Sequence, residues 1–408
     1  MTGAAVRRLE DWSADQLTTI AREVETPAYV LDLDRVRENL DRLQAAFPAA
    51  GIHYAVKANA GRTLLETLAS TAIGAEAASA GEVRRAFEAG FAPASIMYTP
   101  VNPPGRDLDA VLSAAGDAIT ITVGSMDTID RLGDRGFAGP VAIRVHPETG
   151  AGHSESVATG ADAKFGIAID RITAAVEAAT ELGMTVDGLH AHTGSGLLTE
   201  DIPAHRQVVE ALASVAQDLP VDLSFVDVGG GFGVPYREDE AALNLGRIAA
   251  STREALAGLD VSLRIEPGRY LVADAGVLLT TVNTTKPTVD GVLAGVDAGM
   301  SDLLRPALYG SSHPIRNLDA GQGREVTTVS VVGPICESTD VLAENRGLPR
   351  PRRGDLLAIG MTGAYGIEMA NQYNSRPRPP VVAIEDGEFR QARRRETIDD
   401  VIAAEVRR

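Results

Sequence analysis

Lysine is scarce in this 408-residue chain, because only three of its 38 basic residues are lysines and the other 35 are arginines. Cysteine is scarcer still, and the single residue Cys336 cannot form a disulfide within the chain. No apolar run approaches the roughly 18 residues of a membrane-spanning helix, and no apolar segment near the N-terminus is typical of a signal peptide. These absences exclude a disulfide scaffold and a membrane protein, and they predict a soluble protein of the reducing cytoplasm.

Positive charge is also in deficit. The chain has 56 acidic residues and a net charge of −18, whereas binding to nucleic-acid phosphates needs clustered positive charge. We therefore expect no nucleic-acid partner. The acidic composition with few lysines also fits adaptation to high salt, a hypothesis that a stability curve flat in KCl would contradict. A hydrophobic content of 44% is ample for a packed core.

Between residues 51 and 270, short apolar runs alternate with stretches of helical spacing. Eight such runs occur: IHYAVK, IGAEAAS, SIMYT, AITITV, VAIRV, VDGLHAH, LSFVDVG and LRIEPG. Eight alternating units predict an α/β fold, a (β/α)₈ TIM-like barrel with its active site at the carboxyl ends of the strands. A doubly wound open sheet is the alternative.

The pattern changes after about residue 275 to strands without intervening helices, which predicts an all-β domain ending in a short helix. An early strand, PAYVLDLD, precedes the barrel. We expect three parts: residues 1–35 as an N-terminal segment contributing to the β domain, 36–275 as the barrel, and 276–408 as the β-rich domain. The Gly/Ser-rich insertion at 147–163 is either a lid over the site or a disordered loop.

Polar residues end many of the predicted barrel strands, and all of them should therefore lie on one rim. They are Lys57, Arg144, His190, His192, Asp227, Glu266 and Arg269. Lys57 is the informative member, because a lysine amine can lose its proton and form a Schiff base with a carbonyl, whereas a guanidinium stays protonated.

Three further features fit a cofactor at this rim. The glycines of DVGGGFG, including Gly230 and Gly231, either form a plain turn or present backbone N–H groups to an anion, with Arg269 and Ser195 as further donors. Glu266 ends an apolar strand, where a carboxylate needs a partner such as a protonated pyridine nitrogen. His192 is either a core histidine or packs its ring against that pyridine. Together with Lys57, these residues predict a site for pyridoxal phosphate.

Ten motifs spread along the chain resemble those of the fold-type III pyridoxal phosphate decarboxylases, and among them the branch that acts on diaminopimelate. They are YAVKAN, ASAGEV, KFGI, GLHAHTGSG, DVGGGFG, EPGR, DLLRPALY, GPICESTD, GAYG and YNSRPRP. The resemblance implies a barrel with a β-sandwich-like second domain of the alanine racemase kind. It also implies a homodimer with shared active sites, and decarboxylation of meso-2,6-diaminopimelate to L-lysine, the last step of lysine biosynthesis.

The resemblance also implies a role for each matching residue. Lys57 would be the Schiff-base lysine, and Cys336 the proton donor that reaches the partner's site together with Glu337. Cofactor contacts would come from His192, Ser195, Gly230, Gly231, Glu266, Arg269 and Tyr365. Substrate contacts would come from Arg269, Arg305, Tyr309, Glu337 and Tyr365.

Substrate choice depends on the distal end of the substrate, the end that does not react. Diaminopimelate carries an amino group and a carboxylate there, and Glu337 with Arg305 supplies the matching charges; Arg305 could instead belong to a structural ion pair. Two departures from the usual pattern, Gly196 in HTGSG and His146 in RVHPE, weaken the substrate assignment slightly. The alternatives are a decarboxylase of ornithine, arginine or an acidic amino acid, a racemase, and a regulator without turnover, although the chain keeps Lys57 and Cys336.

Overall fold

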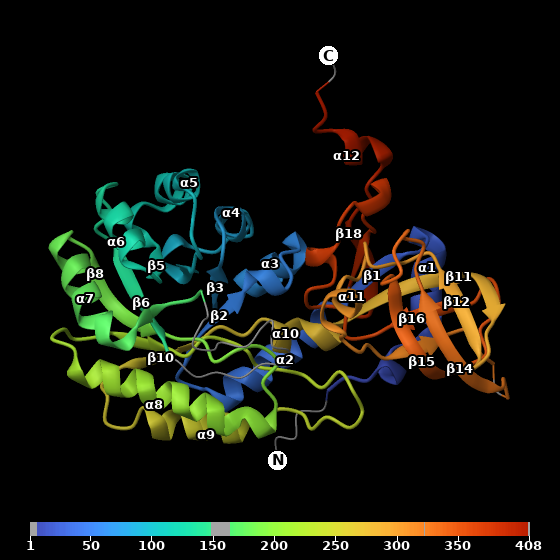
Figure 1. Ribbon diagram of the computed structural model, residues 1–408, viewed down its shortest axis with the longest axis horizontal. Coiled ribbons are helices and arrows are strands. Elements are labelled where there is room, and N and C mark those ends of the chain that lie inside the picture. Colours follow the sequence, from blue (N-terminus) through green and yellow to red (C-terminus); the bar gives the residue numbers. More distant parts are fainter. Residues whose placement is uncertain (1–5, 148–163, 322, 407–408) are drawn as a thin grey trace. The chain divides into compact units, whose positions relative to one another are not determined.

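The computed structural model describes residues 6–147, 164–321 and 323–406 (Figure 1). The contacts within the chain divide it into two compact units. The first, here called the barrel unit, comprises residues 40–234 and 241–270. The second, called the sheet unit, comprises the described residues up to 39, residues 235–240 and those from 271 onward. The predicted insertion lies almost wholly outside the described residues.

The barrel unit contains a closed ring of eight parallel strands, as the eight apolar runs predicted. Each strand pairs with the next, and the last pairs with the first: β2 (Gly51–Ala55), β3 (Gly74–Ala77), β4 (Ile96–Tyr98), β5 (Thr120–Val123), β6 (Pro140–His146), β8 (Thr185–His190), β9 (Phe225–Asp227) and β10 (Ser262–Ile265). A short strand, β7 (Ile167–Ala168), adds to β6. Because the ring closes through the β5–β6 pairing, the alternative of an open doubly wound sheet is wrong.

Helices follow most of the barrel strands and cover the ring (Figure 1). They are α3 (Arg62–Ala69), α4 (Ala80–Glu88), α5 (Gly105–Ala115), α6 (Met126–Gly133), α7 (Ile172–Glu181), α8 (Ile202–Asp218) and α9 (Leu245–Ala255). Three of them begin at a side chain that accepts a hydrogen bond from the first turn, namely Ser79, Ser125 and Asn244. Such caps fix where each strand-to-helix turn ends and therefore which residues lie at the rim.

The sheet unit contains a second, nine-stranded sheet. Its strands are β1 (Ala28–Asp32), β11 (Gly276–Pro287), β12 (Val292–Val296), β13 (Ile315–Asn317), β14 (Val326–Val332), β15 (Val341–Pro349), β16 (Leu356–Ile359), β17 (Val381–Glu385) and β18 (Glu388–Arg393). The early strand β1 lies between β11, to which it is antiparallel, and β17, to which it is parallel. The helices here are α1 (Ala14–Val24), α11 (Arg305–Tyr309) and α12 (Ile398–Ile402), while α2 (Leu33–Ala46) and α10 (Arg269–Val272) cross the unit boundaries.

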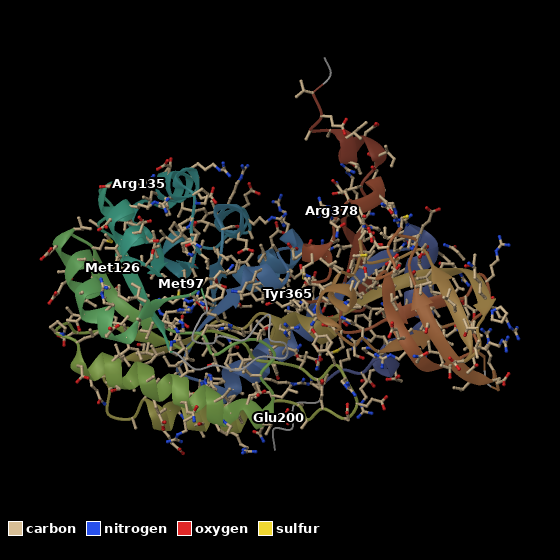
Figure 2. All side chains as sticks on the ribbon, viewed as in Figure 1. Met97, Met126, Arg135, Glu200, Tyr365 and Arg378 are labelled. Atoms are coloured by element: carbon tan, nitrogen blue, oxygen red, sulfur yellow. The ribbon has the colours of Figure 1, made fainter. Side chains whose placement is uncertain are left out.

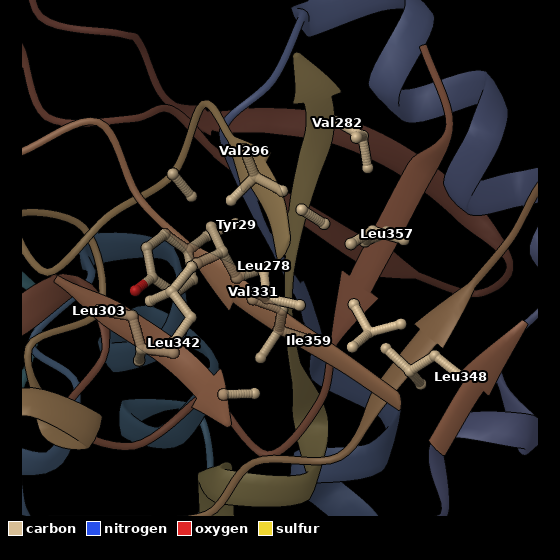
Figure 3. Packing of buried hydrophobic residues seen from close by; sticks show 14 of the residues in the cluster. Tyr29, Leu278, Val282, Val296, Leu303, Val331, Leu342, Leu348, Leu357 and Ile359 are labelled. Atoms are coloured by element: carbon tan, nitrogen blue, oxygen red, sulfur yellow. The ribbon is translucent and has the colours of Figure 1, made fainter. Parts of the chain in front are cut away.

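Two hydrophobic clusters cover the two faces of this sheet, which explains why every residue of β1 and the first five residues of β11 are buried. Along β11, Val277 and Leu279 belong to one cluster, whereas Leu278 belongs to the other (Figure 3). The side chains of a strand alternate between faces, so a strand buried on both faces reads as a continuous apolar run. Trp12 and Leu17, from the N-terminal region, belong to the same cluster as Val277 and Leu279.

Some elements were not anticipated from the sequence. Helix α1 and strand β13 were not expected, and neither was the long strand β15, whose sequence VLAENRGLP is rich in residues uncommon in strands. Pairing with β14 along most of its length holds β15 in place. Among the described residues, no helix is both long enough and apolar enough to cross a membrane.

Candidate active site at the rim of the barrel

Lys57 follows β2 in a short 3₁₀ turn and lies beside a buried carboxyl group. Its Nζ is 2.6 Å from Oε2 of Glu76, a residue of the neighbouring strand β3. The Glu76 side chain is only 1% exposed, whereas that of Lys57 is 42% exposed. Burial raises the pKa of Glu76 to about 7, although the charge of Lys57 acts in the opposite direction. The pair therefore combines an accessible amine with a group that can exchange a proton near neutral pH.

Glu266 directly follows β10 and is held by a buried histidine from the adjoining part of the rim. The Nε2 of His190 lies 3.3 Å from Oε2 of Glu266, and both side chains are almost fully buried. Burial would raise the pKa of Glu266, but His190 and the charge of Lys57 outweigh it and lower the pKa to about 2. Burial lowers the pKa of His190. An ionised carboxylate can only accept, so the Nε2–H of His190 donates to it.

The other oxygen of Glu266, Oε1, is buried and has no hydrogen-bond partner among the described residues. Leaving a buried carboxylate oxygen without a donor costs about 1–3 kcal/mol or more. A bound molecule with a donor at this position would satisfy the oxygen.

The glycine-rich turn after β9 is shaped by its neighbours on the rim. Asp227 accepts a hydrogen bond from the backbone N–H of Gly229 at 2.8 Å, and burial together with the charge of Glu266 raises its pKa well above the usual value. The backbone N–H of Gly230 donates to Nδ1 of His192 at 3.3 Å. The His192 ring is therefore fixed with its proton on Nε2, and burial and the charge of Arg144 lower its pKa to about 3.

This turn has no room for side chains. A methyl group at Gly230 would come within 2.0 Å of the carbonyl oxygen of Glu266, and one at Gly231, where φ is +86°, within 2.2 Å of the carbonyl oxygen of Gly194. Close by, Nη2 of Arg269 donates to Oγ of Ser195 at 3.0 Å. The backbone of the turn, the hydroxyl and the guanidinium thus occur within one unit, as an anion site requires.

The sheet unit carries a second set of candidate residues. Arg305, at the start of α11, is 1% exposed and its Nη1 is 3.2 Å from Nε2 of His313. Tyr309 ends the same helix. Tyr365, labelled in Figure 2, has a φ of +57°, a left-handed backbone conformation that is rare for a tyrosine. Such backbone outliers cluster at functional sites.

Cys336 and Glu337 are exposed, unlike the carboxylates of the barrel rim. The backbone N–H of Cys336 donates to Oδ1 of Asn374 at 3.0 Å. The hydroxyl of Tyr373 donates to the carboxylate of Glu337. The segment YNS, which includes Asn374, therefore orients the Cys–Glu pair within the sheet unit.

The sequence reasoning missed several partners of the candidate residues, among them Glu76, His313, Tyr373 and Asn374. Glu76 had a usable signal, since it is the one charged residue in the apolar run IGAEAAS, where a carboxylate needs a partner. His313 and Tyr373 lie in turn-like segments, and nothing in their spacing connected them with Arg305 or Glu337.

The sequence matches a known protein family. Residues 33–273 match the model of the pyridoxal-dependent decarboxylase family, pyridoxal binding domain. The chain belongs to this family. It is 38% identical over 400 residues to the diaminopimelate decarboxylase of Methanothermobacter thermautotrophicus, covering 94% of this chain and 92% of that one. It is 35% identical over 420 residues to the enzyme of the same name from Escherichia coli K12, covering 97% of both chains.

A solved structure gives the same answer for the fold. The diaminopimelate decarboxylase of Helicobacter pylori, complexed with L-lysine, superposes with a TM-score of 0.89 at 32% identity, covering 95% of this chain and 98% of that chain. The expected (β/α)₈ barrel with a mostly-sheet second domain is confirmed.

The residues present fit the family's cofactor, pyridoxal phosphate. The unpartnered Oε1 of Glu266 matches a protonated ring nitrogen, which is a donor. At Gly230 and Gly231 a side chain would collide with the backbone of Glu266 and Gly194, so the turn packs closely on its neighbours, and Ser195 and Arg269 supply donors that suit a phosphate. Lys57, half exposed at the end of its strand, provides the amine that a pyridoxal aldehyde needs.

Proposed function

We propose that this protein decarboxylates meso-2,6-diaminopimelate to L-lysine and carbon dioxide with pyridoxal phosphate as its cofactor. The observation that carries the substrate assignment is the near full-length similarity to enzymes named for this reaction. The cofactor assignment has independent support in the unpartnered oxygen of Glu266 and in the guanidinium of Arg269 beside the hydroxyl of Ser195.

Lys57 is the proposed cofactor-linked lysine, and Glu76 is its proton partner. Lys57 must lose a proton before its amine can attack a carbonyl. Oε2 of Glu76 lies 2.6 Å away and, with a pKa of about 7, takes that proton and returns it when the amine is released.

Glu266 holds the cofactor ring in its protonated form, and His190 keeps Glu266 oriented. Bound pyridoxal phosphate supplies a cationic ring that accepts the electron pair left on the substrate when carbon dioxide departs. The ionised Glu266 stabilises a proton on the ring nitrogen, which a neutral carboxyl group would not do. His192, neutral and fixed by Gly230, would pack against the cofactor ring when it is bound.

The remaining roles follow the family pattern. Ser195, Gly230, Gly231, Arg269 and Tyr365 serve the phosphate or lie beside it. The substrate is bound by Arg269, Arg305, Tyr309, Glu337 and Tyr365. What supports these roles is the Arg269–Ser195 hydrogen bond, the backbone conformation of Tyr365 and the burial of Arg305.

Cys336 is the proposed proton donor, and it acts on the active site of a second copy in a homodimer. Support comes from the exposure of Cys336 and Glu337 in the single chain, although Asn374 and Tyr373 hold them in a defined arrangement. An arrangement of this kind at a surface is suited to completing a site on a partner.

We also propose that the protein is cytoplasmic and that its domains follow the division at residues 35 and 275. The single, exposed cysteine supports a reducing compartment. The division of contacts into a barrel unit and a sheet unit supports the domains.

Product analysis tests the function directly. Purified protein with added pyridoxal phosphate is offered meso-diaminopimelate, ornithine and arginine in parallel, at low and high KCl. We expect lysine from diaminopimelate and no product from the other two. Putrescine or agmatine instead would keep the cofactor chemistry and refute the substrate assignment.

A further inference from the structure

His313 and Tyr236 contact the guanidinium of Arg305, and neither the sequence motifs nor the family roles assign a function to these two residues. We propose that His313 and Tyr236 are positioning residues that fix Arg305 for the distal carboxylate of the substrate, and that they thereby set selectivity for substrates carrying that carboxylate. This inference rests on the proposed function, because it takes Arg305 as a substrate-binding residue.

The hydrogen bonds of His313 determine its protonation state. Its Nδ1 lies 3.0 Å from the carbonyl oxygen of Gly360, which can only accept, so Nδ1 carries a proton. Its Nε2 lies 3.2 Å from Nη1 of Arg305, which can only donate, so Nε2 offers its lone pair. His313 is therefore a neutral imidazole that links the backbone of the sheet unit to the guanidinium. It is 1% exposed, so it cannot easily reorient.

Tyr236 contacts the same guanidinium through its ring. The Cζ of Arg305 lies 4.5 Å from the ring centroid of Tyr236, within the range of a cation–π interaction. The Tyr236 ring also meets the His313 ring edge to face, with centroids 5.3 Å apart and planes at 78°. All three residues belong to the sheet unit.

These two partners share one property: both are uncharged. The hydrogen bond to a neutral nitrogen and the contact with a ring each restrict the orientation of the guanidinium, and neither of these two contacts neutralises its charge. Restricting the side chain in advance also lowers the entropy lost when a carboxylate binds. A site organised in this way should discriminate strongly against an analogue that lacks the carboxylate.

The experiment compares two competitive inhibitors that differ in this group. L-Lysine has a carboxylate beside its α-amino group, and 1,5-diaminopentane is the same chain without it. Inhibition constants for both are measured against the holoenzyme, together with kcat and KM for meso-diaminopimelate, in the wild type and in His313→Phe. We expect the lysine constant to rise about 10- to 100-fold, as for the loss of a hydrogen bond to a charged group, with the diamine constant almost unchanged. KM should rise with little change in kcat.

Further variants separate positioning from folding. His313→Gln restores an acceptor and should recover part of the affinity for L-lysine. Tyr236→Leu removes the ring and should weaken the binding of L-lysine. The matched control is His205→Gln, because His205 is also a buried histidine but lies in the barrel unit between Thr193 and Thr252. This control should leave the ratio of the two inhibition constants unchanged.

The outcomes are decisive. Equal weakening of both inhibitors, or a fall in kcat with KM unchanged, would overturn the positioning role. If His313→Phe does not fold, the ratio in His313→Gln and Tyr236→Leu decides in the same way. A wild type that does not act on diaminopimelate would instead refute the proposed function, so the two failures are distinguishable.

Discussion

The charged groups at the barrel rim and the Cys336 segment of the sheet unit are held in contrasting ways. At the rim, Glu76 and Glu266 are buried, and each has a partner from another strand end of the same ring. Cys336 and Glu337, by contrast, are exposed and are oriented by a nearby segment of their own unit. The rim can tune protonation states by burial, while the exposed pair has ordinary access to water.

This contrast indicates that the barrel rim and the Cys336 segment contribute to the reaction in different ways. Burial contributes to the pKa shifts of Glu76 and Glu266 at the rim, whereas Cys336 and Glu337 are exposed within the single chain. The exposed segment would need cover from a second copy to act in a water-excluded site. Four variants test this comparison.

The largest effect is expected for Lys57→Ala. Without the amine, turnover should fall to an undetectable level, and the visible absorbance band of lysine-linked cofactor should disappear. Lys286→Ala is the matched control, because Lys286 is an exposed lysine on β11 and its loss should change neither quantity. Activity retained by Lys57→Ala would refute the central assignment of the rim.

Cys336→Ala should reduce kcat by about 10²- to 10⁴-fold, the contribution typical of a positioned proton donor. If the segment completes a partner's site, mixing this variant with Lys57→Ala restores one intact site in each mixed dimer. Random exchange in a two-fold dimer then gives about one quarter of the wild-type activity. No recovery, under conditions where subunit exchange is demonstrated, would place Cys336 in its own chain's site.

Glu266→Gln should lower kcat by about 10²- to 10³-fold, because the variant cannot stabilise a protonated ring nitrogen electrostatically. Asp227→Asn is the matched comparison on the same rim. Burial raises the pKa of Asp227 whereas the pKa of Glu266 is lowered, and asparagine removes the charge while keeping the acceptor for the N–H of Gly229. A loss as large in Asp227→Asn would contradict the opposite pKa shifts of the two carboxyl groups.

The smallest expected effect concerns stability of the cofactor-free protein. Burial raises the pKa of Glu76 from 4.5 to about 7, so folding favours its protonated form. Protonated Glu76 therefore contributes to the stability of the folded state below about pH 4.5, and this contribution is lost as the pH rises to about 7. In denaturant unfolding, the free energy of unfolding of Glu76→Gln should rise relative to that of the wild type by up to about 3 kcal/mol between pH 4.5 and 8.

Glu388→Gln, at an exposed position on β18, is the control for that measurement. Its stability relative to the wild type should not change across this pH range. If Glu76→Gln behaves like Glu388→Gln, Glu76 does not titrate near neutral pH and its proposed exchange with Lys57 fails.

Much of the fold and part of the site could be predicted. All eight barrel strands lie where apolar runs alternate with helical spacing, because strands buried on both faces leave a strong local pattern. Strand β15 left no such pattern, since it depends on pairing with β14 rather than on its own composition. Lys57 and Glu266 were identified because each is chemically unusual at its position.

The sequence by itself determined the order of strands and helices, the family motifs and the types of residue at the strand ends. Only the tertiary structure decided which of those residues meet. Lys57 and Glu76 are 19 positions apart, and His190 and Glu266 are 76 apart. Ring closure brings the carboxyl ends of the strands together. Charge and burial then act through space, and no local pattern records the shifted pKa of Glu76 or the donor missing at Glu266.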